Sequence, residues 1–197
     1  MDLLSEFLVT ILVAIVMQNA VFTRAFGFTK GTISINKPRK IIFFGSTITG
    51  VMLATAIIAW PLNYWLREYN RQNALRYLLY IGCLCIIFVA VHLVTKYFVP
   101  KLHFYYRTML PFAVFNSAVL GSLLIAAGEG YGYLKTLGFA IGSGVGYTLA
   151  LLLIHEGKKR IHLSQVPRSF RGLPIMILYI GIFSLAIYGL IGHQLPT

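Results

Sequence analysis

Long apolar runs without charged residues constrain this chain more than any other feature of its sequence. Most are close to the length of about 20 residues with which an α-helix crosses the hydrocarbon core of a bilayer. The runs are continuous rather than alternating, which favours helices over barrel strands, because lipid requires a backbone whose polar groups are satisfied internally. The sequence therefore predicts an all-α integral membrane protein. Its predicted spans are Leu8–Phe22, Ile41–Trp60, Tyr77–Leu93, Thr108–Ala127, Thr136–Ile154 and Leu173–Ile191.

Composition excludes most other classes of protein. Hydrophobic residues make up 58% of the 197 residues and charged residues only 11%, where a soluble domain carries about 25% charged residues. Six spans leave about 77 positions for tails and connections, too few for a separate soluble domain. We therefore expect one membrane domain over residues 1–197, rather than a cytosolic enzyme, a disordered tail or a disulfide-stapled secreted domain. Asp2 and Glu6 have the wrong charge for the start of a cleavable signal, so we expect none.

The net charge of +12 is distributed unevenly over the connections between spans. Thirteen of the 17 Lys and Arg residues lie in the first, third and fifth connections, and four lie in the other two. The positive-inside rule then places the odd connections in the cytoplasm and both termini outside, with Trp60, Tyr64 and Trp65 at the outer interface. A basic chain can also bind nucleic acid, but that requires a soluble basic surface with base-contacting groups. We expect lipid head groups, and no nucleic acid, beside these charges.

Polar residues interrupt the first and the fourth spans at corresponding places. Six spans divide into two sets of three, over about 1–99 and 100–197, and the two sets have opposite orientations because three is odd. Asn19 interrupts the first span, and Asn116 interrupts the fourth. Such a pair predicts inverted three-helix repeats with broken helices 1 and 4 that meet near the bilayer midplane. The alternative is that each Asn forms a hydrogen bond with a neighbouring helix and nothing more.

Three short segments resemble the motifs of a known family. Asn19–Lys30 stands where that family has Asn-Phe-Val-Leu-x-x-Phe-Leu-Gly-Leu-Cys-Pro, and Phe115–Gly121 stands where it has Thr-Asn-Cys-Ala-Val-Leu-Gly. Val166–Gly172 matches Val-Pro-x-x-Phe-Arg-Gly before the last span. With these segments the chain resembles the A-type integral-membrane subunit of the Rnf electron-transport complex. That subunit is equivalent to the E subunit of the Na+-translocating NADH:quinone reductase (Nqr).

The resemblance implies a function, a location and partners. It implies a membrane subunit, or a paralogue of one, in a complex that couples electron transfer to translocation of Na+ or H+. The chain would be a multi-pass protein of the bacterial cytoplasmic (inner) membrane. Its partners would be a homologous membrane subunit of inverted topology and the other Rnf/Nqr-like subunits.

The resemblance also implies a cofactor, but this sequence departs from the family at the cofactor positions. In the family, one Cys from each of the first two motifs helps to hold a [2Fe–2S] cluster at the interface with the partner, which supplies the other two. Thr29 and Ser117 occupy those positions here, and neutral hydroxyls are poor ligands for iron. We therefore expect no cofactor or metal bound by this chain alone. The motif neighbours that remain are Asn19, Gly27, Asn116 and Gly121.

The sequence contains no nucleophile–base pair, so we expect no catalytic residue in this chain and, at most, a non-catalytic subunit of a translocase. A second hypothesis is a non-redox transporter or channel on the same inverted-repeat scaffold, because half-helix ends can coordinate a small cation without a cofactor. A purely structural membrane subunit is the third possibility.

The two cysteines and one histidine of the third span have modest expected roles. Cys83 and Cys85 are two residues apart, so a regular helix points them about 200° apart, and they cannot converge on one iron. We expect both to be buried small hydrophobic residues. His92 could relay protons, but it has no acidic partner in its span, and we expect it to be packed or to face the interface.

Two further patterns lie in and after the fifth span. Gly138, Gly142 and Gly146 recur every four residues, which predicts a smooth ridge for close packing of a neighbouring helix. The run Lys158–Arg160 is expected to form a solvated, lipid-facing loop rather than a site.

Overall fold

The structure, a computed structural model, describes residues 3–27, 37–68, 73–98, 100–163 and 166–191. Within these residues the chain contains helices and no strands, which confirms the predicted all-α class. The helices are α1 (Leu3–Ile15), α3 (Pro38–Glu68), α4 (Asn73–Phe98), α5 (Pro100–Val114), α6 (Ser117–Gly128), α7 (Tyr133–Leu163), the short 3₁₀ helix η1 (Arg168–Phe170) and α8 (Leu173–Ile191).

Five stretches of this helical structure are long and apolar enough to cross a membrane. They are Pro38–Leu66, Tyr77–Tyr97, Arg107–Gly128, Tyr133–Ile161 and Leu173–Leu190. Helix α1 is also apolar, but its 13 residues extend only about 20 Å, less than the hydrocarbon core of about 30 Å. The described residues thus hold five helical stretches able to span and one shorter apolar helix at the place of the first predicted span.

The predicted boundaries agree with the structure for the fourth span, where Thr108–Ala127 compares with Arg107–Gly128, and for the sixth span, and they differ most at the end of α7. Helix α8 has the same bounds as the sixth predicted span. Helix α7 continues past the predicted end at Ile154 to Leu163, so Lys158–Arg160 lie in its last turns and the expected loop is wrong. Long basic side chains can extend from a helix end into water, so these charges do not have to end the helix.

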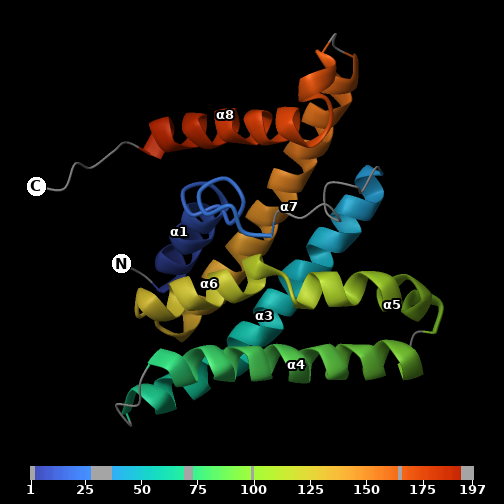
Figure 1. Cartoon of the computed structure of the whole chain (residues 1–197). Coiled ribbons are helices and arrows are strands. Elements are labelled where there is room, and N and C mark those ends of the chain that lie inside the picture. Colours follow the sequence, from blue (N-terminus) through green and yellow to red (C-terminus); the bar gives the residue numbers. More distant parts are fainter. Residues whose placement is uncertain (1–2, 28–36, 69–72, 99, 164–165, 192–197) are drawn as a thin grey trace, which may run out of the picture.

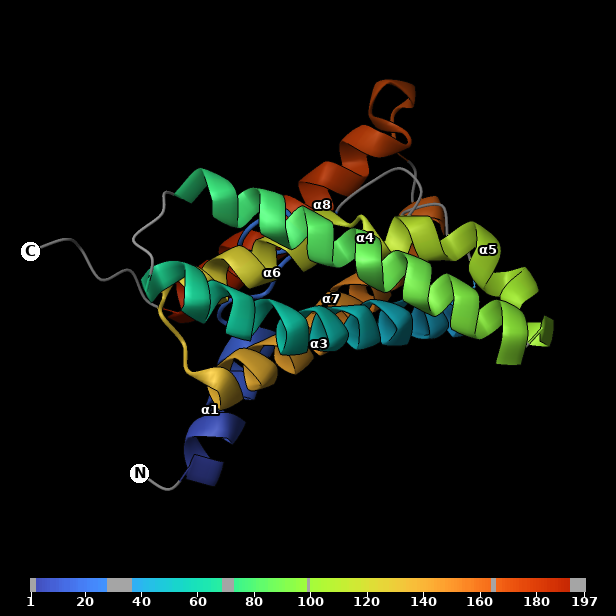
Figure 2. The same ribbon diagram turned by 90° about the horizontal axis from the view of Figure 1, so that it is seen from below.

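Helix α7 runs through the middle of the helix bundle (Figure 1). It packs along α1 and α3, and it also contacts α6 and α8. Helices α4 and α5 lie side by side and both pack on α3, as the view from below shows (Figure 2). The core therefore lies around α7 and α3, while α8 contacts α7 from the side.

The ridge of Gly138, Gly142 and Gly146 on α7 faces α1, as the spacing predicted. A Cβ atom added to Gly142 would lie 2.6 Å from the carbonyl oxygen of Ile11, and one added to Gly146 would lie 2.9 Å from that of Ile15. These distances leave no room for a side chain, so the absence of Cβ atoms lets the two helix backbones approach closely.

A second set of small residues on α7 faces α3. Gly144 lies against Thr49, and Thr148 lies against Gly45. The residue numbers rise along one helix as they fall along the other, so the two helices run antiparallel. Helix α7 is thus packed closely on two sides.

The residues of α4 follow the sequence expectations in part. Cys83 is buried but Cys85 is exposed, so the expected burial of both cysteines is wrong. Only one side of α4 packs against the bundle. Cys83 lies on that side, and Cys85, two residues later, lies more than half a turn around the helix from it. His92 is packed as expected, since its ring stacks on Phe88 with 6.0 Å between ring centroids.

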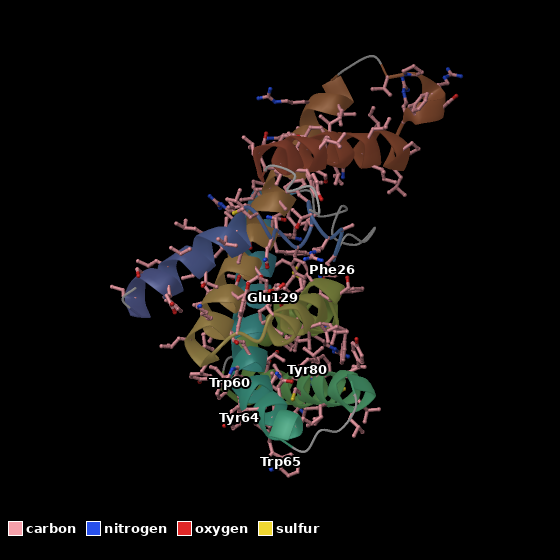
Figure 3. The ribbon with its side chains drawn as sticks, turned by 90° about the vertical axis from the view of Figure 1, so that its left-hand side faces the viewer. Phe26, Trp60, Tyr64, Trp65, Tyr80 and Glu129 are labelled. Atoms are coloured by element: carbon pink, nitrogen blue, oxygen red, sulfur yellow. The ribbon has the colours of Figure 1, made fainter. Side chains whose placement is uncertain are left out.

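Aromatic side chains gather at one end of α3, where Trp60, Tyr64 and Trp65 lie close together (Figure 3). The Trp60 ring stacks on Tyr64, and its Nε1 atom donates a hydrogen bond to the carbonyl oxygen of Tyr131 at 3.1 Å. Trp65 is 59% exposed. Amphipathic rings in such a cluster are typical of a membrane–water interface.

Candidate functional site

Helix α1 ends at Ile15, before the end of the predicted first span, and Asn19 lies in the irregular segment that follows. The side chain of Asn19 is buried, and its Oδ1 atom accepts hydrogen bonds from the backbone N–H groups of Val21 at 3.0 Å and Phe22 at 3.2 Å. Its Nδ2 atom donates to the carbonyl oxygens of Ile15 and Gly146, each at 2.9 Å. An Asn side chain competes in this way with helical hydrogen bonds, and it keeps the buried backbone groups satisfied outside a helix.

The second polar segment separates α5 from α6. Helix α5 ends at Val114, α6 begins at Ser117, and Asn116 between them has extended backbone angles, with φ −85° and ψ 133°. The Oδ1 atom of Asn116 accepts a hydrogen bond from the backbone N–H of Ala118 at 2.9 Å. Asn116 is therefore the N-cap of α6 and satisfies one of the amides that a helix start leaves unpaired.

Tyr147 of α7 joins the two polar segments. Asn116 Nδ2 donates a hydrogen bond to the Tyr147 hydroxyl at 3.0 Å, and this hydroxyl donates to the carbonyl oxygen of Gly27 at 2.9 Å. The Tyr147 side chain is completely buried. Its neighbour Gly146 accepts the hydrogen bond from Asn19, so two successive residues of α7 hold both segments.

Tyr147 was not among the site residues predicted from the sequence, because an aromatic residue in an apolar span is usually part of the core. A signal was nevertheless present, since a buried Tyr hydroxyl nearly always needs a hydrogen-bond partner.

Gly27 lies where the two segments meet. Its backbone N–H donates a hydrogen bond to the Ser117 hydroxyl oxygen at 2.8 Å. Its φ of +72° lies in the left-handed region, and a side chain there would overlap Asn116 and Tyr147. Glycine is therefore required by conformation and by space together.

The remaining predicted site residues are placed as follows. Gly121 of α6 lies against the ring of Phe26, which leaves no space for a Cβ atom at that position. Thr29 lies outside the described residues. Asn19, Gly27, Asn116, Ser117 and Gly121 are thus part of one connected region around Tyr147.

Comparison of the sequence with known protein families shows which family the chain belongs to. The family described as "Rnf-Nqr subunit, membrane protein" matches residues 7–193. The chain belongs to this Rnf-Nqr family. The resemblance seen in the three motifs is thereby confirmed, and the apolar helices make this Rnf-Nqr chain a multi-pass membrane protein.

Individual relatives cover almost the whole Rnf-Nqr chain. One is the A subunit of the ion-translocating oxidoreductase complex of Syntrophotalea carbinolica, 28% identical over 189 residues, which are 96% of this chain and 98% of the relative. The protein of the same name from Azoarcus is 29% identical over the same shares. The A subunit of the Na+-translocating ferredoxin:NAD+ oxidoreductase complex of Acetobacterium woodii is 26% identical, over 92% of this chain and 95% of the relative.

Four residues of the two polar segments are exposed, and we call them the junction face: Arg24, Ala25, Phe115 and Ser117. Phe115 and Ser117 lie in the middle of the span Arg107–Gly128. Irregular backbone at such depth is not found facing lipid, and it occurs only where protein covers it or where it lines a water-filled cavity. The junction face is therefore the candidate functional surface of this Rnf-Nqr chain.

The chemistry of the junction face follows from its donors. Ser117 offers a neutral hydroxyl oxygen, which already accepts the hydrogen bond of Gly27. Among the described residues no three His, Cys, Asp or Glu side chains gather in one place. Such oxygen donors suit hydrogen bonding, whereas the iron of an iron–sulfur cluster requires thiolates, or imidazoles in Rieske centres. The Ser117 hydroxyl, which occupies a family ligand position, is neither of these.

Proposed function

We propose that this chain is the A-type membrane subunit, or a paralogue of it, of an Rnf/Nqr-like complex that couples electron transfer to the translocation of Na+ or H+. Its relatives are named as the A subunits of ion-translocating oxidoreductase complexes, and one of these complexes is named as a Na+-translocating ferredoxin:NAD+ oxidoreductase. The observation that carries the proposal is the junction face, which brings two family motifs together and leaves them uncovered.

In this proposal the two polar segments are the breaks of two inverted repeats, over about 1–99 and 100–197. Each break contains an Asn whose side chain accepts hydrogen bonds from the amides that follow it. Tyr147 and Gly146 hold the two breaks at a fixed separation. The termini lie outside the bacterial inner membrane, as the uneven distribution of Lys and Arg predicts.

A homologous membrane subunit of inverted topology is the partner proposed for the junction face. Ser117 and Arg24 are exposed beside irregular backbone, and lipid cannot satisfy their polar groups. A partner with a matching irregular segment can do so, because polar side chains form hydrogen bonds between packed helices.

This chain supplies no iron ligand in the proposed complex. The family positions hold Thr29 and Ser117, and the Ser117 oxygen is used by the Gly27 amide. The chain instead packs the partner and shapes the region between the two breaks.

Native purification with identification of the partners tests the function, and electron paramagnetic resonance with an iron count tests the missing ligands. We expect the chain to copurify with flavin- and cluster-bearing subunits. Any [2Fe–2S] signal of that complex should persist in a Ser117→Ala variant. Isolation as a homodimer that transports ions without redox partners would favour the non-redox transporter instead. A signal abolished by Ser117→Ala would refute the absence of iron ligands.

A further inference from the structure

Arg24 is a charged residue in the irregular segment after α1, which lies beside the middle of α7 (Figure 1). This segment is held to α7 on both sides of Arg24. Before it, Asn19 donates a hydrogen bond to the carbonyl oxygen of Gly146. After it, the carbonyl oxygen of Gly27 accepts a hydrogen bond from Tyr147. The backbone of Arg24 therefore cannot move far from the middle of α7.

These contacts also set the depth of Arg24 in a membrane. Tyr147 is the central residue of the span Tyr133–Ile161, so Gly27, which it contacts, lies near the middle of the hydrocarbon core. The three residues of chain from Gly27 to Arg24 extend at most about 11 Å. This is less than half the thickness of the core, which is about 30 Å in total. The backbone of Arg24 is thus placed inside the hydrocarbon core.

No acidic side chain of the described residues neutralises Arg24. Its side chain is exposed, and it forms no hydrogen bond or ion pair within the described part of the chain. Of the four described acidic residues, Glu6 and Glu156 pair with lysines. The other two, Glu68 and Glu129, lie at the ends of α3 and α6. A negative charge for Arg24 is therefore sought in another molecule.

The helix ends near Arg24 do not supply this negative charge. Gly27 donates its hydrogen bond to Ser117, at the start of α6, and α5 ends at Val114. The partial negative charge at the end of α5 and the partial positive charge at the start of α6 lie close together, so they largely offset each other. The full charge of Arg24 remains, because a guanidinium is not deprotonated in proteins.

We propose that a carboxylate in a membrane span of the partner subunit forms an ion pair with Arg24. This inference rests on the partner proposed for the junction face, and it adds the chemistry by which that partner is recognised. Ionisable side chains inside membranes face protein or water and pair with one another. A carboxylate accepts two parallel hydrogen bonds from a guanidinium, which fixes the orientation of the two subunits. A phospholipid phosphate fits less well, because head groups lie outside the hydrocarbon core.

The affinity between the two subunits tests the ion pair. The natively purified complex is diluted in detergent, and its dissociation is followed by native electrophoresis. Arg24→Gln should weaken the affinity about 30-fold or more, because loss of one member of a buried charge pair leaves the other unpaired. The matched control Arg107→Gln removes an exposed arginine at the first residue of a span, and it should change the affinity less than about twofold. Equal affinities in the two variants would overturn the proposal.

Cross-linking identifies the carboxylate and does not depend on the Arg24→Gln variant. In Arg24→Lys the positive charge is kept and an amine is introduced. A hydrophobic carbodiimide activates the carboxyl group, the amine attacks its carbonyl carbon, and a urea leaves with one carboxyl oxygen, so that an amide bond joins the subunits. Mass spectrometry should find position 24 linked to one acidic residue within a span of the partner. Absence of this link from the intact complex would also overturn the proposal.

The outcomes separate this inference from the proposed function. If the unmodified chain copurifies with no other membrane subunit, the proposed function fails, and the ion pair fails with it. If the unmodified chain retains its partner and Arg24→Gln retains it equally well, the ion pair alone is wrong. Because Arg24 has no partner among the described residues, we expect Arg24→Gln to keep the gel-filtration profile of the folded chain.

Discussion

Replacing Tyr147 by Phe tests whether one hydroxyl holds the two polar segments together. The substitution keeps the ring and its packing but removes the acceptor for Asn116 Nδ2 and the donor to the Gly27 carbonyl. Both partners are buried, and a buried polar group left without a partner costs about 1–3 kcal/mol. We expect a total loss of about 3 kcal/mol, which for a chain of this size lowers the unfolding temperature by about 6–12 °C.

Tyr179→Phe is the matched control for this experiment. The Tyr179 hydroxyl donates to the carbonyl oxygen of Leu153 at 3.3 Å. This distance is well beyond the usual length of about 2.7–2.8 Å for an O–H···O hydrogen bond, so the loss should stay below about 1 kcal/mol. Both variants are compared with the unmodified protein by thermal unfolding in one detergent. The reasoning is refuted if Tyr147→Phe unfolds at the temperature of the control, because the hydroxyl would then carry no structural role.

Three further substitutions probe the same region. Gly142→Leu should separate α1 from α7 and lower the free energy of unfolding by about 3 kcal/mol, measured by thermal unfolding. The control Gly181→Leu, with open space around the residue, should change that free energy by less than about 1 kcal/mol. Similar losses in the two variants would contradict the close packing of α1. Asn19→Ala should speed hydrogen exchange at the amides of the following turn about tenfold or more, since two of them lose their acceptor; unchanged protection would show that another group satisfies them. Gly27→Ala should lower the yield of folded protein by gel filtration, through both its left-handed backbone and the lack of space, and normal yield would argue against both causes.

Hydrophobic pattern was sufficient for much of the fold. Helix α8 follows a charged connection and contains no charged residue, so its bounds were predicted correctly. The hydrophobic pattern did not predict where α1 ends. In the segment after α1, the Asn19 side chain accepts hydrogen bonds from backbone amides that would otherwise continue the helix. A hydropathy average does not register this competition, because it depends on where one amide group points.

The sequence was sufficient to predict which residues belong to the site, but not how they are connected. The motifs identified Asn19 and Asn116, yet neither motif indicates that α7 lies between them. Their link depends on a tertiary contact with Tyr147 and Gly146, which only the packing of the fifth span determines. The predicted loop at Lys158–Arg160 is wrong because α7 continues through these charged residues to Leu163. Charged residues therefore do not by themselves mark the end of a helix.

The packing of α1 on the glycine ridge has a consequence for biosynthesis. Asn19 and the Gly146 carbonyl that it contacts are 127 residues apart, and ribosomes add about 5–20 residues each second. The first helix thus enters the membrane roughly 6–25 s before its resting place on the fifth span has been made. Because α1 is too short to cross the bilayer alone, its position can be fixed only after the glycines of α7 on which it packs have been made.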